Sequence, residues 1–270
     1  MDKESKLSDV SIILINYNTR DLTKKCLESI YEKTSGVNFE VVVVDNNSND
    51  GSCEMIQECF PEIKLIKSES NLGFASAANI AIENSDCKYI FLLNTDTVLI
   101  NNAIKVMVDF MNDNTQAAAC GGALYNQNGD FVYSFGNLPR LRTYILNRLG
   151  LRFLNKPDKK NRKKRQEVEH IIGADLMLRR QALEDVGKFN TEFFLYNEEL
   201  EFQYRLKNNN YKIYYLPEAE IIHLEGKSCQ DSKLKIKYMR NGEYLYFKHT
   251  KKYLPKMVLK GIFTVLNMLD

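Results

Sequence analysis

The segment FEVVVVD, residues 39–45, decides the fold class of this 270-residue chain. Its apolar residues run without polar alternation, which is typical of a strand buried on both faces of a parallel sheet. Its four valines are β-branched and favour an extended backbone. The segment NNSNDGS (46–52) that follows carries residues that form turns and cap helices, so the sequence predicts a strand followed by a helix.

The same alternation extends on both sides of this segment. Continuous apolar runs predict three further strands: VSIILIN (10–16), IKLIK (63–67) and KYIFLLN (88–94). Helical spacing predicts helices between and after them: around 22–30, around 55–59, at 74–83 and at 103–111. This order predicts an α/β fold, with a mostly parallel central sheet and helices on both faces.

The second half of the chain has a different pattern. Residues 124–136 are punctuated by asparagine and glycine and are expected to hold short strands. The runs YKIYYL (211–216) and AEIIH (219–223) predict a pair of strands, and a last helical region is expected from about Lys233 to the end. No Gly-, Ser- or Pro-rich linker separates the two halves, so we expect the second half to be built onto the same sheet.

The composition limits the class of protein. A net charge of +2 gives no argument for a nucleic-acid partner. The N-terminal residues have no signal-peptide core, and no apolar run approaches the ~20 residues of a membrane-spanning helix. Six cysteines lack CxxC spacing, which predicts reduced core thiols in a cytosolic protein. They are Cys26, Cys53, Cys59, Cys87, Cys120 and Cys229. We therefore expect a cytoplasmic protein, or at most a peripheral membrane protein.

Polar residues end three of the predicted strands: NYN (16–18), DNN (45–47) and NTD (94–96). Open parallel sheets bind ligands outside the carboxyl ends of their strands, so these clusters predict one crevice. Each cluster alone is explained by a turn, because Asn and Asp bond their own backbone. Asn94 and Asp96 also leave a strand end on the same side, which suits a metal ion. At this point the turn and the metal both remain open.

Glycine-rich phosphate-binding loops are missing. The first strand is followed by NYNTRDL (16–22), which has no glycine, and the chain has no Walker A pattern. A dinucleotide fold would need a Gly-rich loop here, and a sugar-activating nucleotidyltransferase would need a Gly-rich, basic one. Phosphates must therefore be held by another group, for which a metal at Asp96 would serve.

Several ordered segments resemble family 2 glycosyltransferases of the GT-A fold. They are VSIILINYN, VVVVDNNSNDGS, NLGFASAAN, FLLNTDT, GADLMLRR, FFLYNEELEFQYRL and AEIIHLEGKS, which together cover about residues 10–229. The chain looks most like the rhamnosyltransferase-like branch that builds bacterial surface polysaccharides. The resemblance implies a Rossmann-like GT-A domain over residues 1–230. Its expected parts are a nucleotide-sugar-binding half (10–123), an acceptor and catalytic half (124–230), and a C-terminal helical extension (231–270).

The resemblance also implies a donor and metal site. It assigns a donor-nucleotide role to seven residues: Asn16, Asn18, Asp45, Asn71, Gly73, Asn79 and Asn94. Asp96 would bind a divalent metal, Mn²⁺ or Mg²⁺, that bridges the donor diphosphate. Asn94 is an amide at the position of the motif's first acid, as in many relatives, so only Asp96 is expected as a direct ligand from this motif. His223 would complete the metal shell, and a histidine hydrogen-bonded at the rim is the alternative.

The acidic segment NEELEF (197–202) is the candidate catalytic site. Acids at a helix N-terminus are favoured by the macrodipole, and Glu201 can pair with Arg205 four residues later. Neither explanation accounts for acids directly after the apolar run FFLY. The resemblance implies that Glu199 is the general base, although relatives carry Asp at this position. Glu198 would orient the acceptor, or would act as the base in place of Glu199. Like-charge repulsion from Glu198 is expected to raise the pKa of Glu199.

The implied reaction is an inverting, metal-dependent transfer. A UDP-, dTDP- or GDP-sugar is the expected donor, and the expected acceptor is a saccharide, with a polyprenyl-linked one favoured. Gly173, Ala174 and Asp175 match the stretch before the acceptor site, while a capping role is the alternative for Asp175. Two rival functions remain, a nucleotidyltransferase and a non-catalytic module that binds nucleotide-sugars or glycans.

Two basic segments suggest partners. KPDKKNRKKR (156–165) is either a solvated loop or a contact with anionic lipid. In KKYLPKMVLKGIFTVLNML (251–269) apolar residues and lysines fall near helical spacing. The apolar residues are Leu254, Met257, Val258, Ile262 and Val265, and the lysines are Lys251, Lys252, Lys256 and Lys260. Such a helix can lie in a membrane interface, or pack on the domain or on a second subunit in a homodimer. We expect peripheral association with the cytoplasmic membrane face.

Overall fold

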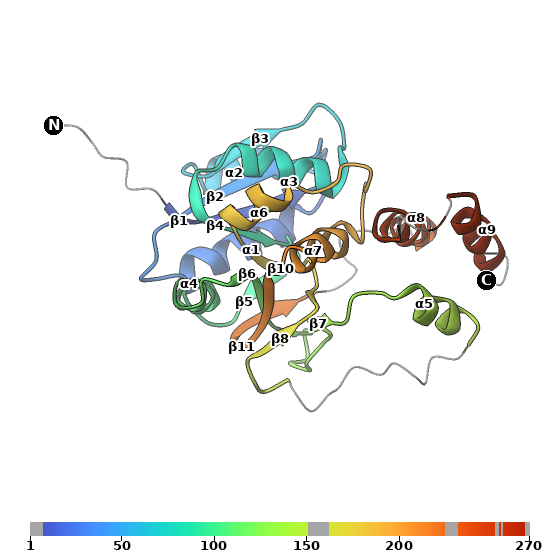
Figure 1. Ribbon diagram of the computed structural model, residues 1–270. Helices are drawn as coiled ribbons and strands as arrows, with labels where there is room; N and C mark the ends of the chain where they lie inside the picture. The colour runs from blue at the N-terminus through green and yellow to red at the C-terminus, as the bar shows by residue number, and fades with distance from the viewer. Residues whose placement is uncertain (1–7, 151–161, 225–231, 252–253, 255, 268–270) are drawn as a thin grey trace.

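The computed structural model describes residues 8–150, 162–224, 232–251, 254 and 256–267 (Figure 1). Within this part of the chain the main sheet has nine strands, in the order β3-β2-β1-β4-β10-β6-β11-β5, and β8 pairs with β11. A second, two-stranded sheet pairs β7 (Phe135–Gly136) with β9 (His170–Ile171). The molecule is therefore an α/β protein built on one large sheet.

The first four predicted strands and helices are confirmed. The strands are β1 (Ser8–Asn16), β2 (Phe39–Asp45), β3 (Lys64–Lys67) and β4 (Cys87–Leu93). The helices are α1 (Arg20–Lys33), α2 (Ser52–Cys59), α3 (Gly73–Glu83) and α4 (Ala103–Asp113). These four strands are parallel, and Asn16 at the end of β1 lies opposite Asp45 at the end of β2. Their carboxyl ends therefore meet at one edge of the sheet.

The second half contributes strands to the same sheet. They are β5 (Thr97–Leu99), β6 (Ala117–Tyr125), β8 (Gln166–Val168), β10 (Asp175–Arg179) and β11 (Lys212–His223). β10 is antiparallel to both β4 and β6, so the sheet is mixed, although its two longest ladders, β1–β2 and β6–β11, are parallel. This insertion brings the start of β10 beside the end of β4, and residues 173–175 beside the strand-end clusters.

The expected strand pair at 211–216 and 219–223 is wrong. One strand, β11, runs through both segments and pairs with β6 along its length. Its register shifts between Leu216 and Glu220, where Pro217 cannot donate to the ladder. The proline interrupts the pairing without turning the chain, and for this reason the sequence resembles two strands.

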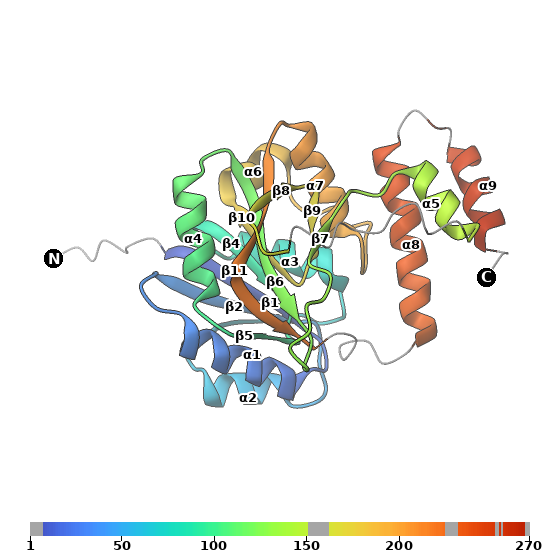
Figure 2. The same cartoon turned by 90° about the horizontal axis from the view of Figure 1, so that it is seen from below.

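Helices cover both faces of the sheet (Figures 1 and 2). Alternate residues of β1 show the division, because Ile12 packs into the layer with α1, α2 and α4, whereas Ile13 packs into the layer with α3. The second layer also contains α6 (Arg180–Val186) and α7 (Glu198–Asn208). Strands buried in this way explain the continuous apolar runs of the sequence.

Three helices form a group beside the α/β body (Figure 2). They are α5 (Leu141–Arg148), α8 (Ser232–Thr250) and α9 (Lys256–Asn267). The ring of Tyr144 on α5 stacks on Phe263 of α9, with their centroids 5.2 Å apart. The same Phe263 also packs against Phe247 of α8, at 6.0 Å. Aromatic residues thus join the three helices into one layer.

The expected apolar face of the last helix is only partly correct. The residues of α9 that are buried are Leu259, Phe263 and Leu266. Met257, Val258 and Val265 lie on another side of the helix and are 86%, 49% and 59% exposed. The helix has one buried and one exposed apolar face, and the spacing in the sequence did not separate them. In the described residues, no helix is both long and apolar enough to cross a membrane.

The cysteines and the basic segment differ in part from expectation. Cys26, Cys87 and Cys120 are buried free thiols, but Cys59 is exposed, so it is not a core thiol. Cys229 and residues 156–161 lie outside the described residues. At the end of the basic segment, Arg165 forms an ion pair with Glu218 at 2.9 Å, which attaches this end to β11.

Candidate active site

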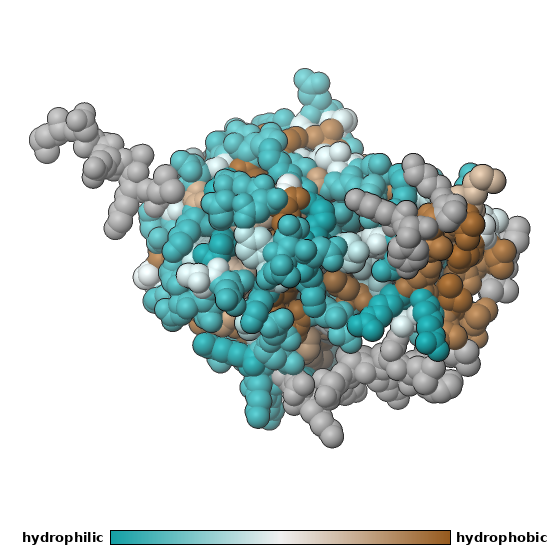
Figure 3. Space-filling model, in the orientation of Figure 1, coloured by the Kyte–Doolittle hydropathy of each residue, from teal (hydrophilic) through white to brown (hydrophobic). Residues whose placement is uncertain are grey.

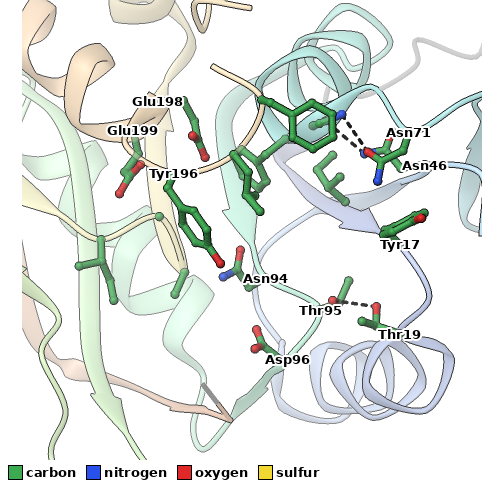
Figure 4. Close-up of a pocket in the computed structure, with 18 of the residues that line it drawn as sticks. Tyr17, Thr19, Asn46, Asn71, Asn94, Thr95, Asp96, Tyr196, Glu198 and Glu199 are labelled. Atoms are coloured by element: carbon green, nitrogen blue, oxygen red, sulfur yellow. Dashed lines mark hydrogen bonds between the residues drawn. The ribbon is translucent and has the colours of Figure 1, made fainter. Parts of the chain in front are cut away.

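A pocket of about 260 Å³ opens where the carboxyl ends of the parallel strands meet (Figure 4). Nine predicted residues line it: Asn71, Gly73, Asn94, Asp96, Gly173, Ala174, Glu198, Glu199 and His223. Further lining residues had no individual role assigned from the sequence. Tyr17, Asn46 and Thr95 belong to the three strand-end clusters, and Thr19 and Tyr196 lie outside them. Most of these lie next in sequence to a predicted residue, so proximity to a polar strand end was the available signal.

The Asn94–Thr97 segment forms a turn and also lines the pocket. The backbone nitrogen of Thr97 donates to the carbonyl of Asn94 at 3.2 Å, and its hydroxyl donates to the same oxygen at 2.7 Å. The backbone nitrogen of Asn94 donates to the carbonyl of Ala174, at 3.0 Å, which joins the turn to the start of β10. Because these bonds use backbone groups and Thr97, the side chains of Asn94 and Asp96 remain available to the pocket (Figure 4).

Asp96 and His223 form the candidate metal site. The Asp96 carboxyl is 3% exposed, and its Oδ1 lies 3.4 Å from Nε2 of His223. The backbone nitrogen of Leu224 donates to the carbonyl of Asp96 at 2.8 Å, which fixes the end of β11 beside the turn. No hydrogen-bond donor in the described part of the chain reaches this Oδ1, so a buried acceptor is left for another group.

This pair fits a divalent metal that a ligand helps to hold. Carboxylate oxygen suits Mg²⁺ and Mn²⁺, and imidazole nitrogen favours Mn²⁺. Among the described residues, no cluster of three or more His, Cys, Asp or Glu side chains could enclose an ion. Two protein ligands leave most positions around an ion open, and diphosphate oxygens are the usual partners of such ions.

The wall of the pocket that is expected to bind the donor, the donor wall, is polar and held by hydrogen bonds. The backbone nitrogen of Gly73 donates to Oδ1 of Asn71 at 3.0 Å, and Nδ2 of Asn46 donates to the carbonyl of Gly73 at 3.1 Å. The Oδ1 of Asn46 is buried and accepts no hydrogen bond from the described residues. Tyr17 is 44% exposed at the rim. An amide acceptor and an aromatic face are groups that bind a nucleoside.

Asn16 and Asp45 do not line the pocket. Asn16 is fully buried, and its Nδ2 donates to Oδ2 of Asp45 at 2.6 Å. Its Oδ1 accepts from the hydroxyls of Thr19 and Thr23, each at 2.7 Å. The two side chains meet because they occupy paired positions at the ends of adjacent strands. They hold the turns after β1 and β2 together, and their contact with a donor remains a prediction.

Three further predicted residues also lie outside the pocket. Asn18 has a φ of +53° and accepts from the backbone nitrogen of Asn49 at 2.9 Å. Asn79 bonds both the carbonyl and the nitrogen of Phe189, at 2.8 and 3.0 Å. Asp175 is fully buried, accepts from Gly122 N at 2.5 Å, and has a pKa raised by burial. All three make structural bonds, which sequence cannot distinguish from ligand contacts.

Glu198 and Glu199 begin α7 and enter the pocket from the side opposite Tyr17 (Figure 4). Burial raises the pKa of Glu199 to about 7. It raises the pKa of Glu198 further, and the charge of Glu199 adds to that increase. Of the two carboxyls, Glu199 is therefore the one that ionises first and can accept a proton near neutral pH. The predicted increase for Glu199 is present, but burial causes it, and like-charge repulsion acts on Glu198.

Other side chains fix the start of α7. Gln203 donates to the carbonyls of Ile171 and Glu199, at 2.8 and 3.0 Å, and accepts from the nitrogen of Ile171 at 2.8 Å. These bonds join the first turn of α7 to β9. Glu201 pairs with Arg205 at 3.0 Å, as the spacing predicted. Glu201 therefore stabilises the helix, whereas Glu198 and Glu199 line the pocket.

The comparison with protein families decides the class. The model for "Glycosyl transferase family 2" matches residues 11–187. The chain belongs to this family. Its matched residues contain the Asn94–Thr97 turn and residues 173–175, whereas Glu198, Glu199 and His223 lie beyond the match. Family membership makes the protein a glycosyltransferase and argues against the nucleotidyltransferase alternative.

Two named glycosyltransferases are similar to this chain over most of its length. It is 29% identical to the low-salt glycan biosynthesis hexosyltransferase Agl10 of Haloferax volcanii, over 82% of this chain and 69% of that protein. It is 26% identical to an N-acetylglucosaminyl-diphospho-decaprenol L-rhamnosyltransferase of Mycobacterium tuberculosis, over 80% of this chain and 76% of that protein. Both relatives transfer sugars, in agreement with the enzyme class.

A solved structure shows the same fold. The mannosyltransferase PcManGT of Pyrobaculum calidifontis, in complex with GDP-Man and Mn²⁺, superposes with a TM-score of 0.63. The match covers 96% of this chain and 70% of PcManGT, at 16% identity. The likeness establishes the GT-A fold that the sequence motifs predicted.

Proposed function

We propose that the protein is an inverting, metal-dependent glycosyltransferase that moves a sugar from a nucleotide-diphosphate donor to a saccharide acceptor. The observation that carries the proposal is one pocket with two different ends. A raised-pKa carboxylate, Glu199, lies at one end, and a buried carboxylate with a histidine, Asp96 and His223, lies at the other. A base at one end and a diphosphate site at the other are what a single displacement needs.

The proposed reaction uses one displacement. Glu199 accepts the proton of an acceptor hydroxyl, whose oxygen forms the new bond to the anomeric carbon. The bond from that carbon to the diphosphate oxygen breaks at the opposite face, so the configuration inverts and a nucleoside diphosphate leaves. Asp96 and His223 would hold the divalent metal, which offsets negative charge on the diphosphate when bound. Asn46 and Asn71 orient the donor at the other wall.

The substrates are proposed from chemistry and relatives. A UDP-, dTDP- or GDP-sugar is the proposed donor, because the donor wall offers amide and aromatic groups that suit a nucleoside. The rhamnosyltransferase relative is named for a decaprenol-linked diphosphate-sugar acceptor. We extend that acceptor class to this chain and propose a polyprenyl-linked saccharide, used in the synthesis of a surface polysaccharide.

Release of nucleoside diphosphate tests the proposal. The chain is incubated with UDP-, dTDP- and GDP-sugars, with Mn²⁺ or with EDTA, and donor binding is followed by calorimetry. We expect one donor to bind and to release its nucleoside diphosphate slowly, with water as acceptor, only when Mn²⁺ is present. Binding without release, even when polyprenyl-linked saccharides are added, would support the non-catalytic module instead. Neither binding nor release would contradict the proposal.

We also propose that the protein lies on an anionic membrane surface through α8 and α9. A groove between these helices is lined by four cationic and several other residues. The cations are Lys233, Lys237, Arg240 and Lys260. The same two helices carry exposed apolar side chains, of which Ile236 lines the groove: Leu234, Ile236, Met239, Met257 and Val258. Figure 3 shows apolar surface gathered on the side where Figure 1 places these helices. Cations beside exposed apolar groups match a layer of anionic headgroups over acyl chains.

Vesicle binding tests this surface. We expect co-sedimentation with phosphatidylcholine vesicles that contain phosphatidylglycerol, and little with phosphatidylcholine alone. The double change Lys237→Glu and Lys260→Glu should weaken binding by about 30-fold or more, at about 1 kcal/mol for each cation lost. The matched control is Lys24→Glu with Lys25→Glu, which changes two exposed lysines of α1. Equal loss in both variants, or self-association without vesicles, would contradict a membrane role for the groove.

A further inference from the structure

The segment that carries the two glutamates has an unusual backbone. Tyr196 and Asn197, directly before Glu198, have φ values of +71° and +70°. Two consecutive non-glycine residues in the left-handed region persist only where their surroundings hold them in place. Asn197 also accepts the first helical bond of α7, from the nitrogen of Glu201 at 3.1 Å. Any movement of this turn therefore moves the carboxylates at the start of the helix.

One side of the segment contacts the donor wall. The backbone nitrogen of Phe74 donates to the carbonyl of Phe194 at 2.7 Å. Gly73 has a φ of +77°, and a Cβ at this position would overlap the Phe194 carbonyl. The donor wall and the segment before α7 therefore touch backbone to backbone, without an intervening side chain.

The other side of the segment contacts α8, which lies beyond the residues that match the family model. A Cβ on Gly242 would overlap the Tyr196 carbonyl oxygen and lie 2.8 Å from Nδ2 of Asn197. Four residues before it, Tyr238 stacks on Phe194 with centroids 4.9 Å apart. Near the end of the helix, Lys248 donates to Glu192 at 2.5 Å. Tyr238 and Gly242 are four residues apart on one face of α8. His249, seven residues after Gly242, lies on the same face with its ring centroid 6.0 Å from that of Phe193, so this face follows the segment.

We propose that α8 is a positioning element for the reaction, and that Gly242 allows the close contact that holds the Tyr196–Asn197 turn in its left-handed conformation. The turn is fixed between two glycines, Gly73 on the donor wall and Gly242 on α8. This inference rests on the proposed role of Glu199 as base. It adds that α8 fixes the orientation of the Glu199 carboxylate, although the described residues of the C-terminal helices contribute nothing to the pocket lining.

The test compares two glycine substitutions in the C-terminal helices. Gly242→Ala adds a methyl group that must displace the turn or α8. Gly261→Ala is the matched control, because a Cβ there would meet nothing within 4 Å. Misplacement by about 1 Å can cost about 100-fold in rate, so we expect Gly242→Ala to lower kcat by about 10- to 100-fold. The KM for the donor should stay within about twofold, because the metal end of the pocket is unchanged.

Two readouts separate positioning from a general loss of structure. The pH at which kcat falls by half should move down in Gly242→Ala, since a displaced turn admits water to Glu199. Amide exchange of residues 193–201 should rise in Gly242→Ala and stay at the wild-type rate in Gly261→Ala, whichever reaction the pocket performs. If Gly242→Ala fails to fold, Tyr238→Leu removes the ring stack without adding an overlap, and it should show the same kcat loss at constant KM.

The outcomes are distinct from those of the proposed function. A wild-type protein that releases no nucleoside diphosphate overturns the function, while the exchange measurement still reports on the turn. An active wild type in which Gly242→Ala matches Gly261→Ala in rate, pH profile and exchange overturns the positioning role. A parallel change of kcat and KM with an unchanged pH profile also overturns it.

Discussion

Glu199→Gln is expected to lower the rate of sugar transfer by about 10²- to 10⁴-fold, the range that a positioned general base contributes. The amide keeps the size and most hydrogen-bonding geometry of the carboxylate, but it cannot accept the acceptor's proton. Donor affinity, measured by calorimetry, should change by less than about twofold, because Glu199 lies at the end of the pocket away from Asp96 (Figure 4). The measurement is kcat and KM for both substrates.

The pH dependence gives a second check on Glu199. The base acts in its ionised form, so the wild-type rate should rise with pH and reach half its maximum near pH 7, where burial places the pKa. That acidic limb should disappear in Glu199→Gln. The matched control is Glu54→Gln, which removes an acid from the first turn of α2, where it is exposed. A Glu199→Gln variant with wild-type kcat would assign the base elsewhere, with Glu198 the next candidate.

Asp96→Asn should cause the second large loss, in metal-dependent binding as well as in rate. The variant keeps the shape of the side chain and removes the charge of an acceptor that is buried and receives no bond from the described residues. We expect transfer to fall by about 10²- to 10³-fold, the scale for losing one preorganised electrostatic group. The strengthening of donor binding by Mn²⁺ should disappear in calorimetric titrations with the donor and Mn²⁺ together.

The control for this variant is Asp86→Asn. Asp86 is exposed just before β4, at the opposite edge of the sheet, and its substitution should leave both rate and Mn²⁺ dependence unchanged. If Asp96→Asn bound the donor with the same Mn²⁺ dependence as the wild type, the metal would have to be held elsewhere in the protein.

The parallel half of the fold could be predicted because its strands are buried on both faces. Their apolar runs are continuous, and each ends in polar residues at the same edge of the sheet. β6 was missed because its residues, AAACGGALY, are small and have weak strand preference, and close contacts with its neighbours favour them over larger side chains. β11 was divided in two because a proline inside a strand has the same signature as a turn.

The sequence predicted which strand ends form the site, but it did not predict which side chains at those ends point into the pocket. Asn16 and Tyr17 are adjacent, yet the first is buried in the turn and the second faces the pocket. A strand alternates its faces, so the choice depends on the last paired residue, which a pattern locates only to within a residue or two. The packing of α8 on the Tyr196–Asn197 turn had no sequence signal, since Gly242 is a lone glycine in a helix.

The configuration of the first sugar released from the donor distinguishes inversion from retention. The donor that releases its nucleoside diphosphate is hydrolysed by the wild-type protein with Mn²⁺, and the anomeric proton is followed by NMR before mutarotation. We expect the first product to have the configuration opposite to that of the donor, and Glu199→Gln to form it at a rate lower by at least about 100-fold. A first product with the donor's own configuration, or equal rates for the two proteins, would contradict the proposed mechanism.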